Sequence, residues 1–201
     1  MFVLTLMRDN VRTHPADFRK PRLNALLDEL NAKYANKILH NVGLGIRVYD
    51  VLDASEETVH MVQDGSSQSK VTFRLIVYRP FKGEIMTGRV AHNDPREGVR
   101  VSMDFFDDII IPPAFMQPGT EFDEAEKLWV WRYEGSDLYM DIDEPVRFRV
   151  EVEQFVDVGP VRVGQEDTEG GAENEASKRP APYSLLVSIA EPGLGLTAWW
   201  E

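Results

Sequence analysis

The most regular pattern of apolar and polar positions lies between residues 14 and 37. Its apolar members recur at helical spacing, with polar residues between them: Leu23, Leu26, Leu27, Leu30 and Tyr34. Pro21 suits the first turn of such a helix, where a missing N–H costs nothing. The pattern predicts an amphipathic helix whose apolar stripe packs against a sheet.

Alternation with a period of two surrounds this helix. It predicts strands near residues 1–11, 37–52, 58–62 and 70–80. Gly43 and Gly45 interrupt the second of these, which indicates a bulge or a close backbone approach. In the last, one face is apolar throughout: Val71, Phe73, Leu75 and Val77. Residues 1–80 therefore read as a small α+β domain, an antiparallel sheet with one main helix.

The pattern after Pro80 is almost entirely that of strands. Strands are predicted at residues 83–91, 98–103, 107–112, 128–133, 145–158 and 183–190, with a further one at 197–200. The cleanest alternation places four residues on an apolar face: Val146, Phe148, Val150 and Val152. Several short strands with irregular loops favour an all-β OB-type barrel over residues 81–201.

One stretch lacks any such pattern. Residues 164–181 are rich in Glu, Gly and Ala, and hold no apolar residue larger than Ala. A segment that buries so little apolar surface cannot offset its ordering entropy. We therefore predict a disordered acidic loop between the last two barrel strands.

Composition narrows the possible functions. The chain has no cysteine, which excludes disulfides and thiolate chemistry. No apolar run approaches the roughly 20 residues that cross a bilayer, and the N-terminus lacks the features of a signal peptide. A net charge of -12 and a pI near 4.8 argue against independent binding to nucleic acid.

Enzymatic chemistry has little support in the sequence. The strongest catalytic reading is a Mg²⁺-dependent hydrolase that uses Asp104, Asp107 and Asp108. Acidic residues beside an apolar strand are more often its solvated ends, and no nucleophile motif or phosphate-binding loop accompanies them. The four histidines are scattered without metal-ligand spacing. We expect no enzyme, no metal and no cofactor.

The sequence gives more support to a binding function. OB barrels bind single-stranded nucleic acid with cationic side chains and aromatic rings. The first two barrel strands and the residues just before them carry five candidates: Lys82, Arg89, His92, Arg96 and Arg100. If residues 197–200 form a strand, Trp199 and Trp200 point to opposite sides, and one of them is exposed at a partner or domain interface.

The sequence also resembles a known family over essentially its whole length. The junction "RPFKGE" (79–84), the segment "FDDIIIP" (106–112) and the ending "WWE" (199–201) are similar to the larger stalk subunit of eukaryotic RNA polymerase III. RNA polymerase II and archaeal polymerases have related subunits.

The resemblance implies a fold and a set of partners. It implies an RNP-like tip domain followed by an OB domain, pairing with a smaller helical stalk subunit, and docking on the polymerase core. It further implies contact with nascent single-stranded RNA, cooperation with initiation factors, and a place in the nucleus. Residues implied in docking on the core are Asn41, Gly43, Gly45, Asp64, Gly65 and Ser66.

The sequence differs from typical RNA-binding OB modules at one point, and one alternative function remains open. Gly98 is followed by Val99, Arg100 and Val101, so the second barrel strand lacks the aromatic residue that RNA-binding OB modules often carry there. The rival is a free-standing OB-fold protein that binds single-stranded RNA, or a module like those of translation factors.

Overall fold

The computed structural model describes residues 1–59, 65–133, 135–157 and 180–200. It consists mostly of β-strands, with a single α-helix among the described residues. The chain forms two compact units that divide between Arg79 and Pro80, and each is described by itself below. In the described part, no helix is both long and apolar enough to span a membrane.

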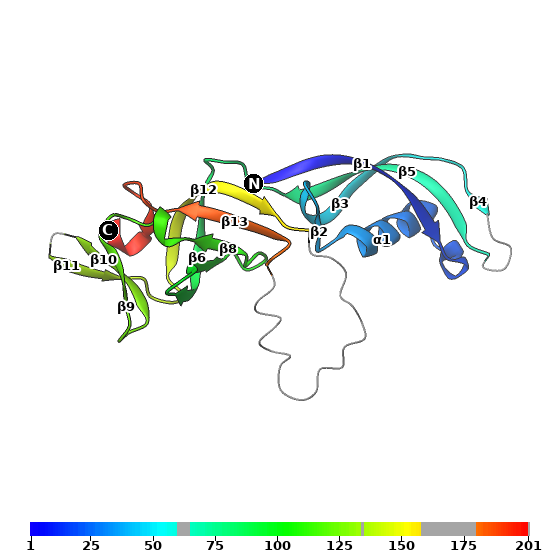
Figure 1. Ribbon diagram of the computed structural model, residues 1–201. Coiled ribbons are helices and arrows are strands. Elements are labelled where there is room, and N and C mark those ends of the chain that lie inside the picture. The colour runs from blue at the N-terminus through cyan, green and yellow to red at the C-terminus, as the bar shows by residue number, and fades with distance from the viewer. Residues whose placement is uncertain (60–64, 134, 158–179, 201) are drawn as a thin grey trace, which may run out of the picture. The chain divides into compact units, whose positions relative to one another are not determined.

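The first unit is an antiparallel sheet with one helix on it (Figure 1). It runs β1 (Phe2–Thr13), a 3₁₀ turn (Pro15–Arg19), α1 (Arg22–Tyr34), β2 (Lys37–Leu39), β3 (Gly43–Ala54), β4 (Thr58–Val59) and β5 (Ser67–Tyr78). The strand order is β1-β5-β3-β2, and β4 also pairs with β5.

The core of this unit lies between α1 and the sheet. Leu26 and Leu30 of the helix contact the apolar face of β5, which is fully buried as predicted. Leu23, predicted to belong to the same stripe, is 53% exposed. That part of the prediction is wrong because the helix joins the core cluster only from Leu26 onward.

Residues 37–52 form a hairpin rather than the single predicted strand. Asn41 adopts a φ of 60° in the turn between β2 and β3. The prediction for the two glycines is confirmed. The register shifts after Gly45, and a Cβ would lie 2.5 Å from the Tyr78 carbonyl oxygen at Gly43 and 2.5 Å from that of Tyr34 at Gly45.

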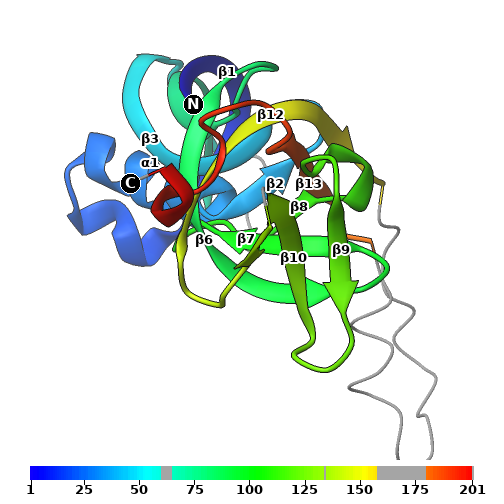
Figure 2. The ribbon, with the colours of Figure 1, turned by 90° about the vertical axis from the view of Figure 1, so that its left-hand side faces the viewer.

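The second unit contains a closed five-stranded barrel (Figure 2). Its strands are β6 (Ile85–Asp94), β7 (Gly98–Ser102), β8 (Ile109–Ile111), β12 (Pro145–Phe155) and β13 (Tyr183–Ser188). They follow one another in the order β13-β8-β7-β6-β12, and β12 pairs with β13 to close the ring. The β8–β13 pair is parallel, whereas the other pairs are antiparallel.

A small separate sheet is inserted between β8 and β12. It has the order β11-β10-β9, with β9 (Thr120–Asp123), β10 (Leu128–Tyr133) and β11 (Ser136–Tyr139). Trp129 of β10 donates its indole N–H to the carbonyl oxygen of Asp94 over 3.1 Å, which ties this sheet to the β6–β7 turn of the barrel.

Several predictions for this unit need correction. β9, β11 and the short β14 (Gly195–Leu196) were not predicted, because each is too short to show an alternation. Residues 197–200 form a 3₁₀ helix, η3, rather than a strand. Val152 is exposed, because the pairing of β12 with β13 shifts register between Val150 and Val152. Most of the predicted acidic loop lies outside the described residues.

Candidate nucleic-acid interface

Three of the predicted cationic residues lie together on the outer face of β6 and β7. His92 is paired directly with Arg100, and Arg89 with Ser102. Arg89 and His92 are three residues apart, so a regular strand would turn them to opposite faces. A register shift between Val90 and His92 brings both to the exposed face.

Carboxylates compete for these cations. Arg100 forms an ion pair with Glu97 over 3.1 Å, and Arg89 forms one with Asp143 over 3.5 Å. Arg89 also donates to the backbone carbonyl oxygen of Asp143 over 3.0 Å. Burial raises the pKa of Asp108, while Arg100 opposes that rise. A phosphate that binds here must displace or share these acidic groups, so the electrostatic contribution of the face is modest.

The turn that carries Arg96 is tightly held. The Asp94 carboxylate accepts hydrogen bonds from the backbone N–H groups of Arg96 (2.7 Å) and Glu97 (2.9 Å). The bond from Glu97, followed by that from Arg96, lowers the pKa of Asp94. Gly98 ends the turn with a φ of 99°. Arg96 is therefore exposed on an ordered turn beside the Arg89–His92–Arg100 group.

Lys82 is remote from that turn. It lies in the exposed turn before β6, whereas Arg96 follows the other end of the strand. Strands rise about 3.3 Å per residue, so the ten residues of β6 separate the two by roughly 30 Å. The five predicted residues thus do not form one cluster.

An aromatic side chain that sequence reasoning did not select lies just after β7. Phe105 is 44% exposed in the connection to β8. It lies within the acidic stretch 104–108, in which only the carboxylates suggest a function from the sequence alone. Ser102 donates to the Asp107 carboxylate there. Among the described residues, no group of three or more acidic or histidine side chains could hold a metal ion.

The residues implied in core docking fall into two groups at opposite ends of β5. Gly43 is the first residue of β3, and the next residue, Leu44, pairs with Tyr78 at one end. Gly65 and Ser66 precede Ser67 at the other. Twelve residues of strand, roughly 40 Å, separate the groups. Asp64 lies outside the described residues.

The members of these groups differ in exposure. Asn41 is exposed, and its carbonyl oxygen accepts a hydrogen bond from Arg79 over 3.0 Å. Gly43 and Gly45 are buried inside their own unit. Ser66 is also buried, and its hydroxyl accepts a hydrogen bond from Arg12 over 2.9 Å.

The two terminal tryptophans pack on β10. The ring centroid of Trp131 lies 5.3 Å from that of Trp199 and 6.2 Å from that of Trp200. Trp200 is 47% exposed, whereas Trp199 is half-buried and lies over Gly195.

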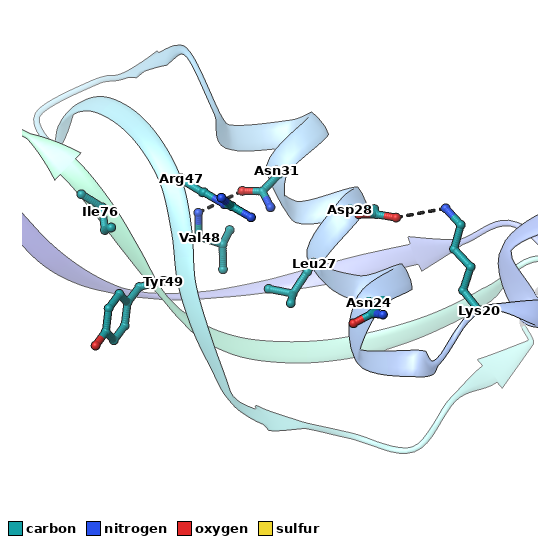
Figure 3. Close-up of a pocket in the computed structure, with 9 residues that line it drawn as sticks. All are labelled: Lys20, Asn24, Leu27, Asp28, Asn31, Arg47, Val48, Tyr49 and Ile76. Atoms are coloured by element: carbon teal, nitrogen blue, oxygen red, sulfur yellow. Dashed lines mark hydrogen bonds and ion pairs between the residues drawn. The ribbon is translucent and has the colours of Figure 1, made fainter.

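The first unit also holds an open groove between α1 and β3 (Figure 3). Its volume is about 560 Å³. Lys20 and Asp28 form an ion pair over 3.0 Å at one end, and Asn31 accepts a hydrogen bond from the backbone N–H of Val48 over 3.0 Å. The sequence offered no signal for it, because its walls come from α1, β3, Ile76 of β5 and Lys20, which only the fold brings together.

Known proteins resemble this chain over its whole length. A family model described as RNA polymerase III subunit Rpc25 matches residues 84–200. A second, described as the SHS2 domain found in the N terminus of Rpb7p/Rpc25p/MJ0397, matches residues 8–70.

The chain belongs to the Rpc25 family of RNA polymerase III subunits.

Relatives within and beyond the Rpc25 family agree with this assignment. DNA-directed RNA polymerase III subunit RPC8 of Bos taurus is 47% identical over all of this chain and 98% of its own length. The subunit rpc8 of Schizosaccharomyces pombe is 43% identical over the whole of both chains. The archaeal subunit Rpo7 of Saccharolobus solfataricus is 33% identical over 55% of this chain and 60% of its own. The predicted resemblance is confirmed.

Proposed function

We propose that this chain is a non-catalytic stalk subunit of DNA-directed RNA polymerase III that acts in the nucleus. The observation that carries the proposal is the similarity, over the full length of this chain, to proteins named as subunits of that polymerase. In this proposal the chain pairs with the smaller helical stalk subunit and supports initiation, with its factors, on genes for transfer RNA and other small RNAs.

The proposal gives the two units different tasks. Residues 1–80 form the RNP-like tip domain and residues 81–201 an OB domain. The five-stranded Greek-key character of the barrel supports the second assignment, because its third and fifth strands, β8 and β13, are neighbours and parallel. The match of the SHS2 model to residues 8–70 supports the separate character of the first.

RNA contact is proposed for the outer face of β6 and β7. Arg89, His92 and Arg100 form its centre, and Arg96 extends it. Lys82 is proposed to contact the RNA at a separate point, remote from Arg96. Few phosphates can be neutralised by so small a set. Attachment to a large polymerase raises the local concentration of the barrel near emerging RNA, so weak contacts suffice.

Docking on the polymerase core is proposed for the two turns at the ends of β5. Asn41 contributes an exposed turn position and Gly65 a half-buried one, while Gly43, Gly45 and Ser66 hold the shape of these turns through their buried contacts. Trp200, which is exposed next to the half-buried Trp199, is proposed as a contact for a partner protein.

A pull-down of the tagged full chain from nuclear extract of its own organism tests the assembly. We expect mass spectrometry to recover a small helical partner together with core subunits of polymerase III. Recovery of the chain alone, or with ribosomes, would instead favour the free-standing RNA-binding protein.

A salt titration tests the RNA face. In the stalk heterodimer, Arg89→Ala with Arg100→Ala should weaken binding to single-stranded RNA and lower the slope of log K against log salt by about one or more. The matched control is Arg8→Ala with Arg47→Ala, which removes the same charge from exposed positions of the first unit. Equal slopes for both double variants would contradict the assignment.

A further inference from the structure

A third strand of the barrel carries a cation next to the proposed RNA face. Arg147 of β12 is exposed, while its neighbours in the chain, Val146 and Phe148, are fully buried. It is paired directly with Thr87 of β6, which is also exposed. Directly paired residues point to the same side of a sheet. Arg147 therefore lies on the outer face of the barrel, the face that also holds Arg89.

Three arginines form a diagonal line across this face. Thr87, the partner of Arg147, comes two residues before Arg89 on β6. Ser102, the partner of Arg89 on β7, comes two residues after Arg100. Diagonal neighbours of this kind lie about 7 to 8 Å apart, within reach of long side chains. Arg147, Arg89 and Arg100, which we call the arginine line, thus cross β12, β6 and β7 in one direction.

Arg147 differs from the other two members of the arginine line in its contacts. Arg89 has an ion pair with Asp143, and Arg100 has one with Glu97. Arg147 forms no ion pair or side-chain hydrogen bond with any residue in the described part of the chain. A phosphate can therefore bind Arg147 without displacing a carboxylate.

The strand positions around Arg147 carry no acidic side chain, as far as the described residues extend. On the two strands that pair with this part of β12, the positions opposite or diagonal to Arg147 are uncharged or basic: Ile85, Thr87 and Arg89 on β6, and Gly195 on β14. On β12 itself, the next outward positions hold Pro145 and Arg149. Arg149 is ion-paired with Glu151 over 3.0 Å and with Glu191 over 2.6 Å, so its charge is already balanced. The positive charge of Arg147 is therefore available to a ligand, although the chain as a whole is acidic.

The face is hollowed beside the arginine line. An open hollow of about 300 Å³ has Thr87, Arg89 and Pro145 in its lining, and these are neighbours of Arg147 on β6 and β12. Asp104 is an acidic residue of the same lining. Proteins that bind single-stranded nucleic acid commonly place its backbone in a positively charged groove. A strand that follows the arginine line has room for a base in the hollow while its phosphates face Arg147 and Arg89.

We propose that Arg147 is a phosphate-binding residue of the RNA face, and that single-stranded RNA crosses the barrel along the arginine line from β7 to β12. Guanidinium groups bind phosphate oxygens through two parallel hydrogen bonds, and those of Arg147 are not used by the chain itself. The inference rests on the proposed contact with RNA. It extends that contact to a third strand, which the residues selected from the sequence do not include.

Binding of fluorescein-labelled oligouridylate of about 12 nucleotides to the stalk heterodimer, followed by anisotropy at several salt concentrations, tests the proposal. One phosphate contact on a single strand contributes about 0.7 to the slope of log K against log salt. Arg147→Ala should therefore reduce the slope by about 0.7, and the affinity at about 0.1 M salt by about fivefold. Arg147→Lys keeps the charge and should keep the slope. The matched control is Arg47→Ala, which removes an exposed arginine from the first unit and should change neither quantity.

Two results would overturn the proposal. If Arg147→Ala binds RNA with the affinity and slope of Arg47→Ala, the RNA does not reach β12. If an oligoaspartate peptide binds more tightly than oligouridylate and loses affinity in Arg147→Ala, the residue serves an acidic protein segment. The variant with both Arg89→Ala and Arg100→Ala separates this inference from the proposed function. Weaker RNA binding in that variant alone leaves the proposed RNA face intact, whereas unchanged binding in every variant contradicts the RNA face itself.

Discussion

The two units use the same strand alternation but cover their sheets differently. In the first, α1 lies on one face of the sheet, while Phe2, Leu4 and Leu6 of β1 are exposed. In the second, the sheet curls until β12 meets β13, and its apolar side chains face the interior. The first core thus depends on a few helix side chains, and the second on unbroken strand pairing around a ring.

Each unit also carries its own spectroscopic reporter. All four tryptophans lie in the second unit, and the α-helix of the described residues lies in the first. Tryptophan fluorescence therefore follows unfolding of the barrel unit, and ellipticity at 222 nm chiefly follows α1. The contrast between the units can be tested with one chain and two signals.

The largest effect is expected at the backbone of the barrel. Gly98→Ala should lower the free energy of unfolding by about 4 kcal/mol or more, because the new Cβ collides with the Ile111 carbonyl oxygen and φ is 99°. The midpoint of the urea transition followed by tryptophan fluorescence should move to a lower urea concentration. The control is Gly193→Ala, which has a φ of 84° but open space around the new Cβ, and should cost about 1 to 2 kcal/mol.

The next effect is expected in the helix of the first unit. Leu30→Ala should cost about 3 kcal/mol, since it leaves a cavity under a fully buried side chain. The change should appear in the transition at 222 nm rather than in tryptophan fluorescence. Leu23→Ala makes the same substitution at an exposed position of the same helix and should change stability by less than about 0.5 kcal/mol. Equal losses in the two variants would refute this picture of the core.

The smallest expected effect is a pH dependence of stability that has opposite signs at a carboxylate of each unit, Asp9 in the first and Asp108 in the second. Burial favours a higher pKa for Asp9, but hydrogen bonds from Lys33 and Tyr34 outweigh it, and the pKa is lowered. A lowered pKa stabilises the fold above the unfolded value of about 3.9, and this stabilisation is lost as the pH falls through the folded value. Asp9→Asn should therefore be less stable than wild type at pH 7, by less than about 1 kcal/mol, and equal to it in strong acid.

Asp108 should behave in the opposite way. Burial raises its pKa, so its ionised form weakens the fold at neutral pH, and stability returns as the pH falls through the folded value. Asp108→Asn should be slightly more stable than wild type at pH 7 and equal to it in strong acid. Urea titrations of both variants at pH 7 and in strong acid, below the folded pKa of Asp9, check the pair. If both substitutions change the free energy of unfolding in the same direction at pH 7, the direction of the pKa shift given for one of the two carboxylates is wrong.

The local pattern of the sequence predicted much of the fold. The alternate residues of β5 from Val71 to Val77 are buried as expected, because a strand turns successive side chains to opposite faces whatever its neighbours are. The helix was found for the same reason, as its 3.6-residue period is a property of the segment itself. The family was evident from short motifs, and the comparisons confirm it.

Other features depended on contacts between distant segments. The register shift that turns Arg89 and His92 to one face arises from the pairing of β6 with β7. Ring contacts of Trp131 with Trp199 and Trp200 join β10 to η3. The separation of the two turns proposed for core docking follows from the antiparallel pairing of β3 with β5.

The sequence by itself determined which residues are apolar, at which period they recur, and to which family the chain belongs. Only the tertiary structure decided which side chains share a surface. The physical reason is that register, bulges and ring contacts depend on the partner strand, which periodicity within one segment does not specify.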